Sequence, residues 1–230
     1  MLALFCTALL LSIPQIFHRN RLDSISEGSV GDGRLINGNL IPYSGKNFCY
    51  FSLISYYPCG DAYLNSKLLT TIVDAYEECD STCPGICFRL MECSRKNGGK
   101  MQLHLSHQNG LSVDFMTPLI LNNEPIKRYD NLGLLRYLLE FDEKGELSME
   151  KGVTIDFETI AKHIVALDNA ARKNGLAIKK VILKIDLKDN LFATESGKEL
   201  LRRAIPFARA LPAGIDAVHG NHYHIDFREL

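Results

Sequence analysis

Five of the seven histidines fall in two short clusters whose residue types are those of metal ligands. The first cluster runs from His104 to Asp114, and the second from His219 to Asp226. Zinc binds imidazole nitrogen and carboxylate oxygen, and three protein ligands plus a water make an open, catalytic site. A closed structural site would need four ligands, usually including thiolates. The two clusters together therefore predict a catalytic metal site.

The second cluster is typical of a strand. Successive side chains of a strand point to opposite faces, so His222, His224 and Asp226 share one face. The residues on the other face are the apolar Tyr223, Ile225 and Phe227. Two residues two positions apart on one strand face lie about 7 Å apart at the backbone. That separation suits two ligands, or one ligand and a neighbour just outside the coordination shell.

In the first cluster, a tight turn at Gly110 precedes another strand. Glycine permits the backbone conformation of such a turn. Apolar and polar side chains then alternate, so Asp114 is expected to point away from the apolar face and back towards His107. The apolar positions are Leu111, Val113 and Phe115. This local unit would supply one nitrogen ligand and one oxygen ligand.

Plainer interpretations of these residues stay open. Short motifs arise by chance, and we interpret the isolated His18 and His163 as satisfied core or surface residues. An aspartate after a glycine turn is often part of the turn itself. Asp226 is either a carboxylate that orients a ligand imidazole or a surface carboxylate. The role of His104 is also open.

Both clusters resemble the motifs of the penicillin-insensitive murein endopeptidases, zinc enzymes of the wider superfamily of lysostaphin-type and D-Ala-D-Ala metallopeptidases. The first resemblance lies in Gly98-Gly99-Lys100-Met101 followed by His104-x-x-His107-Gln108-x-Gly110-x-x-x-Asp114. The second lies in His219-x-x-His222-x-His224 near the C-terminus, and a weaker one in Gly33 to Gly38 with Leu40 and Pro42. The resemblance spans residues 33–227.

This resemblance implies that His107, Asp114 and His224 bind Zn2+. It also implies that His222 is the catalytic histidine and His219 a second active-site histidine. The chain departs from the family in lacking tryptophan, in the segment 115–118 and in a cysteine-rich stretch at 79–93. These departures bear on substrate specificity more than on zinc chemistry.

By the same resemblance, the chain would be a zinc metallopeptidase that hydrolyses D-alanyl–diaminopimelyl cross-links of bacterial peptidoglycan in the periplasm. Two alternatives are a D,D-carboxypeptidase or dipeptidase acting on free wall peptides, and a non-catalytic wall-binding module of the same fold. The sequence has no H-E-x-x-H motif and so lacks the glutamate base of such motifs. We therefore expect His222 to move the proton and His219 to stabilise the oxyanion or position substrate.

Composition restricts the class of protein. Of the 230 residues, 46% are hydrophobic and 23% are charged, which is typical of a globular chain. The 26 basic and 27 acidic residues give a net charge of -1, so charge alone does not favour nucleic acid or an anionic membrane as a partner.

The N-terminal segment predicts export. Residues 2–17 form an uncharged, largely apolar run that is short for a membrane span, which needs about 20 residues. We interpret residues 1–20 as a signal peptide and 21–230 as one metallopeptidase domain, without stable membrane insertion of the mature chain. An uncleaved anchor is the main alternative, because no basic side chain precedes the run and no clear cleavage motif follows it.

Six cysteines lie beyond the predicted signal peptide, at positions 49, 59, 79, 83, 87 and 93. An even number in an exported chain predicts disulfides, although six cysteines allow 15 connectivities. The rival interpretation is a metal or iron–sulfur site at 79–93, but that spacing does not match the common motifs.

The remaining pattern predicts an α+β fold: a single domain whose central antiparallel sheet carries the zinc site and is flanked by helices. Helical periodicity covers 64–76 and 156–174, and Thr194 is suited to cap a last helix. Strands are expected at 86–92, 178–185 and 222–227, with short extended pieces and loops over 22–47.

Overall fold

The computed structural model describes residues 2–101 and 104–230, with side chains from Cys6 onward. Met1, the first residue of the predicted signal peptide, lies outside the described residues. The described chain is a mixed α+β structure, as predicted. Its α-helices are α1 (Leu2–Ile16), α2 (Ser66–Thr82), α3 (Phe157–Lys173), α4 (Lys188–Ala193), α5 (Glu195–Arg202) and α6 (Ala213–Val218). Three other helical turns are η1 (Ser55–Cys59), η2 (Gly133–Leu138) and η3 (Ile185–Leu187).

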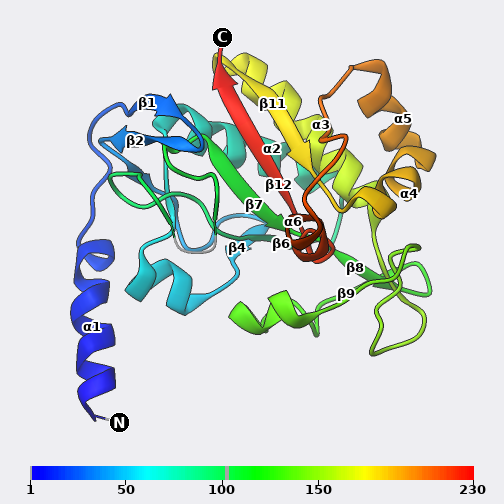
Figure 1. Cartoon of the computed structure of the whole chain (residues 1–230), viewed down its shortest axis with the longest axis horizontal. Helices are drawn as coiled ribbons and strands as arrows, with labels where there is room; N and C mark the ends of the chain where they lie inside the picture. The colour runs from blue at the N-terminus through cyan, green and yellow to red at the C-terminus, as the bar shows by residue number, and fades with distance from the viewer. Residues whose placement is uncertain (1, 102–103) are drawn as a thin grey trace.

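The largest sheet has five strands in the order β11-β12-β7-β6-β4 (Figure 1). Its strands are β11 (Leu176–Ile182), β12 (His222–Glu229), β7 (Ser112–Met116), β6 (Phe88–Leu90) and β4 (Phe48–Tyr50). The predicted central antiparallel sheet is found only in part: β11, β12, β7 and β6 pair antiparallel, whereas β4 pairs with β6 in parallel. β4 has only three residues, too few for an alternating pattern to mark it in the sequence.

Three smaller sheets surround the large one. They contain the hairpin of β1 (Ile25–Ser29) and β2 (Asp32–Ile36), the pair of β3 (Asn39–Leu40) and β5 (Tyr63–Leu64), and the group of β8 (Leu119–Leu121), β9 (Glu124–Ile126) and β10 (Val153–Ile155). The segment 22–47 thus contains short extended pieces, as expected.

Helices α2 and α3 pack against each other behind the large sheet (Figure 1). Between helices and sheet, the ring of His163 on α3 stacks on Tyr76 and Phe88, with centroids 5.0 and 4.8 Å apart. His163 Nδ1 lies 2.6 Å from the hydroxyl of Tyr223. His163 is therefore a core residue, as its isolation in the sequence predicted.

The predicted and observed helix boundaries agree best where a side chain caps the helix. Asp156 accepts from the backbone N–H of Thr159 at the start of α3, and the helix ends before Asn174 and Gly175. Thr194 accepts from the backbone N–H of Gly197 and so caps α5. Such side chains satisfy the free N–H groups of a first turn. The helix expected from residue 64 begins instead at Ser66, after the cap residue Asn65.

The cysteines differ from the expectation based on the sequence, and the predicted removal of the N-terminal segment is not tested by the structure. All seven cysteines are free thiols in the structure, so it contains none of the predicted disulfides. The apolar N-terminal run is helix α1, and among the described residues no helix is both long and apolar enough to span a membrane. Removal of residues 1–20 stays a prediction.

Candidate metal centre

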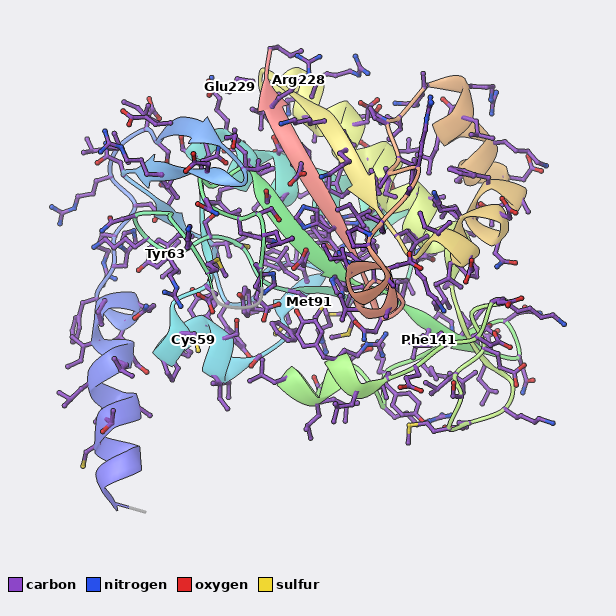
Figure 2. All side chains as sticks on the ribbon, in the orientation of Figure 1. Cys59, Tyr63, Met91, Phe141, Arg228 and Glu229 are labelled. Atoms are coloured by element: carbon purple, nitrogen blue, oxygen red, sulfur yellow. The ribbon has the colours of Figure 1, made fainter. Side chains whose placement is uncertain are left out.

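The antiparallel pairing of β7 with β12 brings the two histidine clusters together. His224 lies directly opposite Asp114, and His222 lies opposite Met116. Directly opposed residues of antiparallel strands have Cα atoms about 4.5–5.5 Å apart, close enough for side chains to meet. The Nδ1 atom of His224 is 2.7 Å from Oδ1 of Asp114. β12 itself runs from the buried His222 to the exposed Arg228 and Glu229 at the edge of the molecule (Figure 2).

His107 reaches the same carboxylate from the loop before β7. Its Nε2 atom lies 3.3 Å from Oδ2 of Asp114. The backbone of His107 has a φ of 67°, which is unusual for a residue other than glycine. The next residue holds this conformation, since Gln108 donates from its backbone and side chain to the carbonyls of Val30 and Gly31 in the β1–β2 hairpin.

Neither ring nitrogen of His107 has a hydrogen-bond partner, although the ring is fully buried. Buried polar atoms without partners are rare because they lose their hydration without compensation. A metal ion bound to Nε2 would satisfy one of these nitrogens, so the environment of His107 fits that of a ligand.

His104 approaches the same point. Its Nδ1 atom is 3.7 Å from Oδ2 of Asp114. His104, His107 and Asp114 each offer an atom within 4.8 Å of the others, a grouping that could hold a metal ion. Burial lowers the pKa of His104 to about 4, so its ring is neutral near pH 7, as a ligand must be.

His224 lies between two carboxylates. Its Nε2 atom is 2.7 Å from Oδ1 of Asp226, which is itself buried and bound by Ser112 and Lys180. Asp226 is thus a carboxylate that orients an imidazole, not a surface residue. Burial opposes the charged ring, but the hydrogen bonds to Asp114 and Asp226 raise the pKa of His224 to about 9.

This arrangement requires a cation at Nδ1. A neutral imidazole donates from one nitrogen only. If Nε2–H donates to Asp226, the lone pair of Nδ1 faces an oxygen of Asp114 at 2.7 Å. A proton on Nδ1 removes the repulsion, and a metal ion bound at Nδ1 would take the place of that proton. A ligand histidine whose second nitrogen donates to a carboxylate is the usual arrangement around a protein-bound metal.

His222 is held as a neutral ring with one free nitrogen. The amide nitrogen of Asn221 donates to the carbonyls of Tyr137 and Leu139, which turns its Oδ1 towards His222. Oδ1 accepts from Nδ1–H of His222 at 2.8 Å, so Nε2 is the nitrogen without hydrogen. Burial lowers the pKa of His222 to about 3, and the ring is neutral at physiological pH.

His219 lies beside His222, with ring centroids 4.7 Å apart. Its Nδ1–H donates to the backbone carbonyl of Ile215 at 2.6 Å. Burial lowers the pKa of His219, so its Nε2 is an acceptor near neutral pH. The neutral ring favours the substrate-positioning role over the oxyanion role, because stabilising an oxyanion would need a donor at Nε2.

Sequence patterns did not mark the acid–phenol pair behind these histidines. The hydroxyl of Tyr137 donates to the carboxylate of Glu92, and the Tyr137 ring meets the His222 ring edge-on at 5.5 Å. Burial raises the pKa of Glu92 to about 8, and the hydrogen bond from Tyr137 opposes that shift. Neither residue belongs to a motif, whereas Asn221 was detectable from its position between His219 and His222.

The pKa of Glu92 predicts how stability depends on pH. A carboxyl whose folded-state pKa is raised contributes stability below its unfolded value, near 4.5, and this contribution is lost as pH rises towards 8. We expect metal-free wild type to lose up to about 5 kcal/mol over this range relative to Glu92→Gln, since one pKa unit is about 1.36 kcal/mol. Urea unfolding at several pH values, in a chelator, measures the difference; parallel curves for the two proteins would contradict it.

The structure therefore brings together all five histidine and aspartate residues predicted for the site, and it adds His104. His18 lies elsewhere, against the ring of Tyr63. The chain matches no protein-family model and no curated protein.

Proposed function

We propose that this chain is a zinc-dependent murein endopeptidase that hydrolyses D-alanyl–diaminopimelyl cross-links of bacterial peptidoglycan in the periplasm. One observation carries the proposal: His107, Asp114 and His224 converge beside His222, a neutral histidine with a free ring nitrogen. The sequence resemblance supports the same ligand set and the same catalytic histidine.

The donor set supports zinc as the metal. Two imidazole nitrogens and a carboxylate oxygen are the ligands of an open catalytic zinc site. His104, His107 and Asp114 form such a group in the structure, and His224 contacts the same carboxylate. When bound, zinc acidifies water from a pKa of about 15.7 towards 7 and polarises a carbonyl group. Asp226 fixes the orientation of the His224 ring, so that Nδ1 faces Asp114 and would be the nitrogen that holds the metal.

The proton-transfer role belongs to His222. Its Nε2 atom is free to accept a proton while Nδ1–H stays on the oxygen of Asn221. Burial lowers the pKa of the ring to about 3, and the carboxylate of Asp114 opposes that shift and favours the protonated ring. The imidazolium formed can return that proton to the leaving amine, as a general base that becomes a general acid. His219, whose Nε2 is an acceptor, is suited to bind an N–H group of the peptide and to position it.

Two other functions share parts of this site. A D,D-carboxypeptidase or dipeptidase would use the same ligands on free wall peptides, and a wall-binding module would keep the fold without turnover. The products distinguish these cases, because only an endopeptidase separates cross-linked dimers into monomers.

The test is purified protein incubated with muropeptide dimers, with and without a chelator, followed by mass analysis of the products. We expect monomers from the untreated enzyme, none after chelation, and recovery when zinc is added back. Release of terminal alanine alone would indicate a carboxypeptidase. Intact dimers with bound zinc would indicate a binding module and contradict the proposal.

A further inference from the structure

Three segments distant in the sequence present apolar, uncharged surface on one side of the molecule. They are α1, the η1 segment (residues 51–60) and the η2 segment (residues 131–139). In Figure 1, α1 extends downward from the body, and the short cyan and green helices of η1 and η2 lie along the same lower edge. Figure 2 places Cys59 of η1 there, beside α1.

Large apolar side chains are exposed on all three segments. On the η1 and η2 segments they are Leu53, Ile54, Leu134, Leu135 and Leu138, which we call the apolar rim. Cys59 and Asn131 are the other exposed residues of the η1 and η2 segments. Leu138 is 73% exposed and Leu53 is 61% exposed. The only charged residue in the η1 and η2 segments is Arg136, which is fully buried. Large exposed apolar side chains gathered on one side of a protein indicate a contact with another protein or with a membrane.

Helix α1 is tied to the body just beyond its end. Asn20 exchanges two hydrogen bonds with the backbone of Leu40, at 2.9 and 2.8 Å, and the ring of His18 packs on Tyr63. An apolar groove of about 400 Å³ separates α1 from η1, and its lining includes Leu9, Ile16, Leu53, Ile54 and Tyr57. Residues 18–20 are thus integrated in the fold that carries the rim.

The geometry points to a lipid bilayer as the occupant. α1 has 15 residues without charge, which gives a length of about 22 Å at 1.5 Å per residue. That is less than the roughly 30 Å hydrocarbon core but more than one leaflet. Most of its described large side chains are exposed, and a short helix of this kind is marginal in water alone.

The positions of the basic residues also favour a membrane contact. The exposed Arg19 and Arg21 come directly after the uncharged helix, at its junction with the body. Cationic side chains at such a boundary attract anionic lipid headgroups. Apolar side chains beside them can enter the boundary between headgroups and acyl chains, about 5–10 Å deep.

We propose that the chain, with α1 in place, docks on an anionic lipid bilayer through α1 and the apolar rim. η2 belongs to both the rim and the metal centre, since Tyr137 meets the His222 ring. Docking would therefore hold the metal centre close to the membrane surface. The proposal does not depend on the peptidase function, because lipid binding is measured without turnover.

The test is co-flotation of the full chain with vesicles of phosphatidylcholine containing phosphatidylglycerol. We expect wild type to float with the vesicles. The bound fraction should be at least tenfold lower for a variant with four substitutions: Leu53→Glu, Ile54→Glu, Leu134→Glu and Leu135→Glu. Leu201→Glu with Met149→Glu is the matched control, because both positions are exposed and lie outside these segments. The control should bind like wild type.

Several outcomes would overturn the proposal. It fails if wild type stays unbound, or if the fourfold variant floats like wild type. It also fails if wild type self-associates without vesicles, in sedimentation, and the fourfold variant is monomeric, because a second copy then covers the rim. The double variant Arg19→Gln, Arg21→Gln tests the role of charge. If it loses binding to anionic vesicles only, those side chains lie at the headgroups.

Discussion

Replacing His222 with alanine is expected to lower turnover of cross-linked muropeptides by about 10²–10⁴-fold, the usual contribution of a general acid–base group. The variant should keep its metal, because the proposed ligands His107 and His224 both contact Asp114, whereas the ring of His222 is held by Asn221. Turnover rates and zinc content per chain, measured on the same preparation, test both statements.

A control is Met149→Ala. This side chain is exposed and lies outside the clustered imidazoles, so its loss should leave both turnover and zinc content unchanged. Normal turnover by His222→Ala with one zinc per chain would assign the proton transfer to another group, and His219 would be the next candidate.

The histidine clusters were predictable because strand geometry is local. The two-residue period of β12 fixes which side chains share a face, and Tyr223, Ile225 and Phe227 are indeed buried on the core side. The period does not show what covers the second face. His224 and Asp226 are buried as well, so both faces of this strand lie inside the protein.

The conformation of the loop before β7 was not predictable in the same way. The sequence placed His107 across a turn from Asp114, and the distance of 3.3 Å agrees with that. The positive φ of His107 depends on contacts of Gln108 with a hairpin more than seventy residues earlier. No local pattern contains that contact, and the position of His104 beside the same carboxylate is part of the same loop conformation.

Long-range contacts also explain the residues that no motif marked. Glu92 is a single carboxyl in an ordinary segment, and its burial depends on Tyr137 and Ser55 from two other segments. The three-residue strands β4 and β8 are likewise too short to carry a period of their own. Capped helices were placed well, because Asp156 and Thr194 act within one turn.

The cysteine count illustrates the limit of composition. An even number predicted disulfides, and the structure instead contains free thiols, three of them buried in the core. Cys79, Cys83 and Cys93 pack among apolar side chains, where a thiol behaves as a small hydrophobic group. Their number alone could not distinguish packing from cross-linking.

Replacing His224 with alanine is expected to weaken zinc binding by more than the 10- to 100-fold that loss of an outer-shell partner costs. Two ligand sets share His107 and Asp114, and they differ in whether His224 or His104 completes them. The sequence resemblance favours His224, whose ring Asp226 fixes, whereas the spatial grouping of His107 and Asp114 contains His104.

The comparison of four variants separates the two sets. Asp114→Ala should abolish zinc binding in either case, and Asp226→Asn should weaken it about 10- to 100-fold, because Asp226 acts only through His224. His104→Ala is the matched test of the rival set and should bind zinc nearly as wild type. Competition against a chromophoric chelator measures each affinity. If His104→Ala loses zinc while His224→Ala and Asp226→Asn keep it, the metal belongs to His104, His107 and Asp114, and the pairing of β7 with β12 then supplies a charged hydrogen bond in place of a ligand.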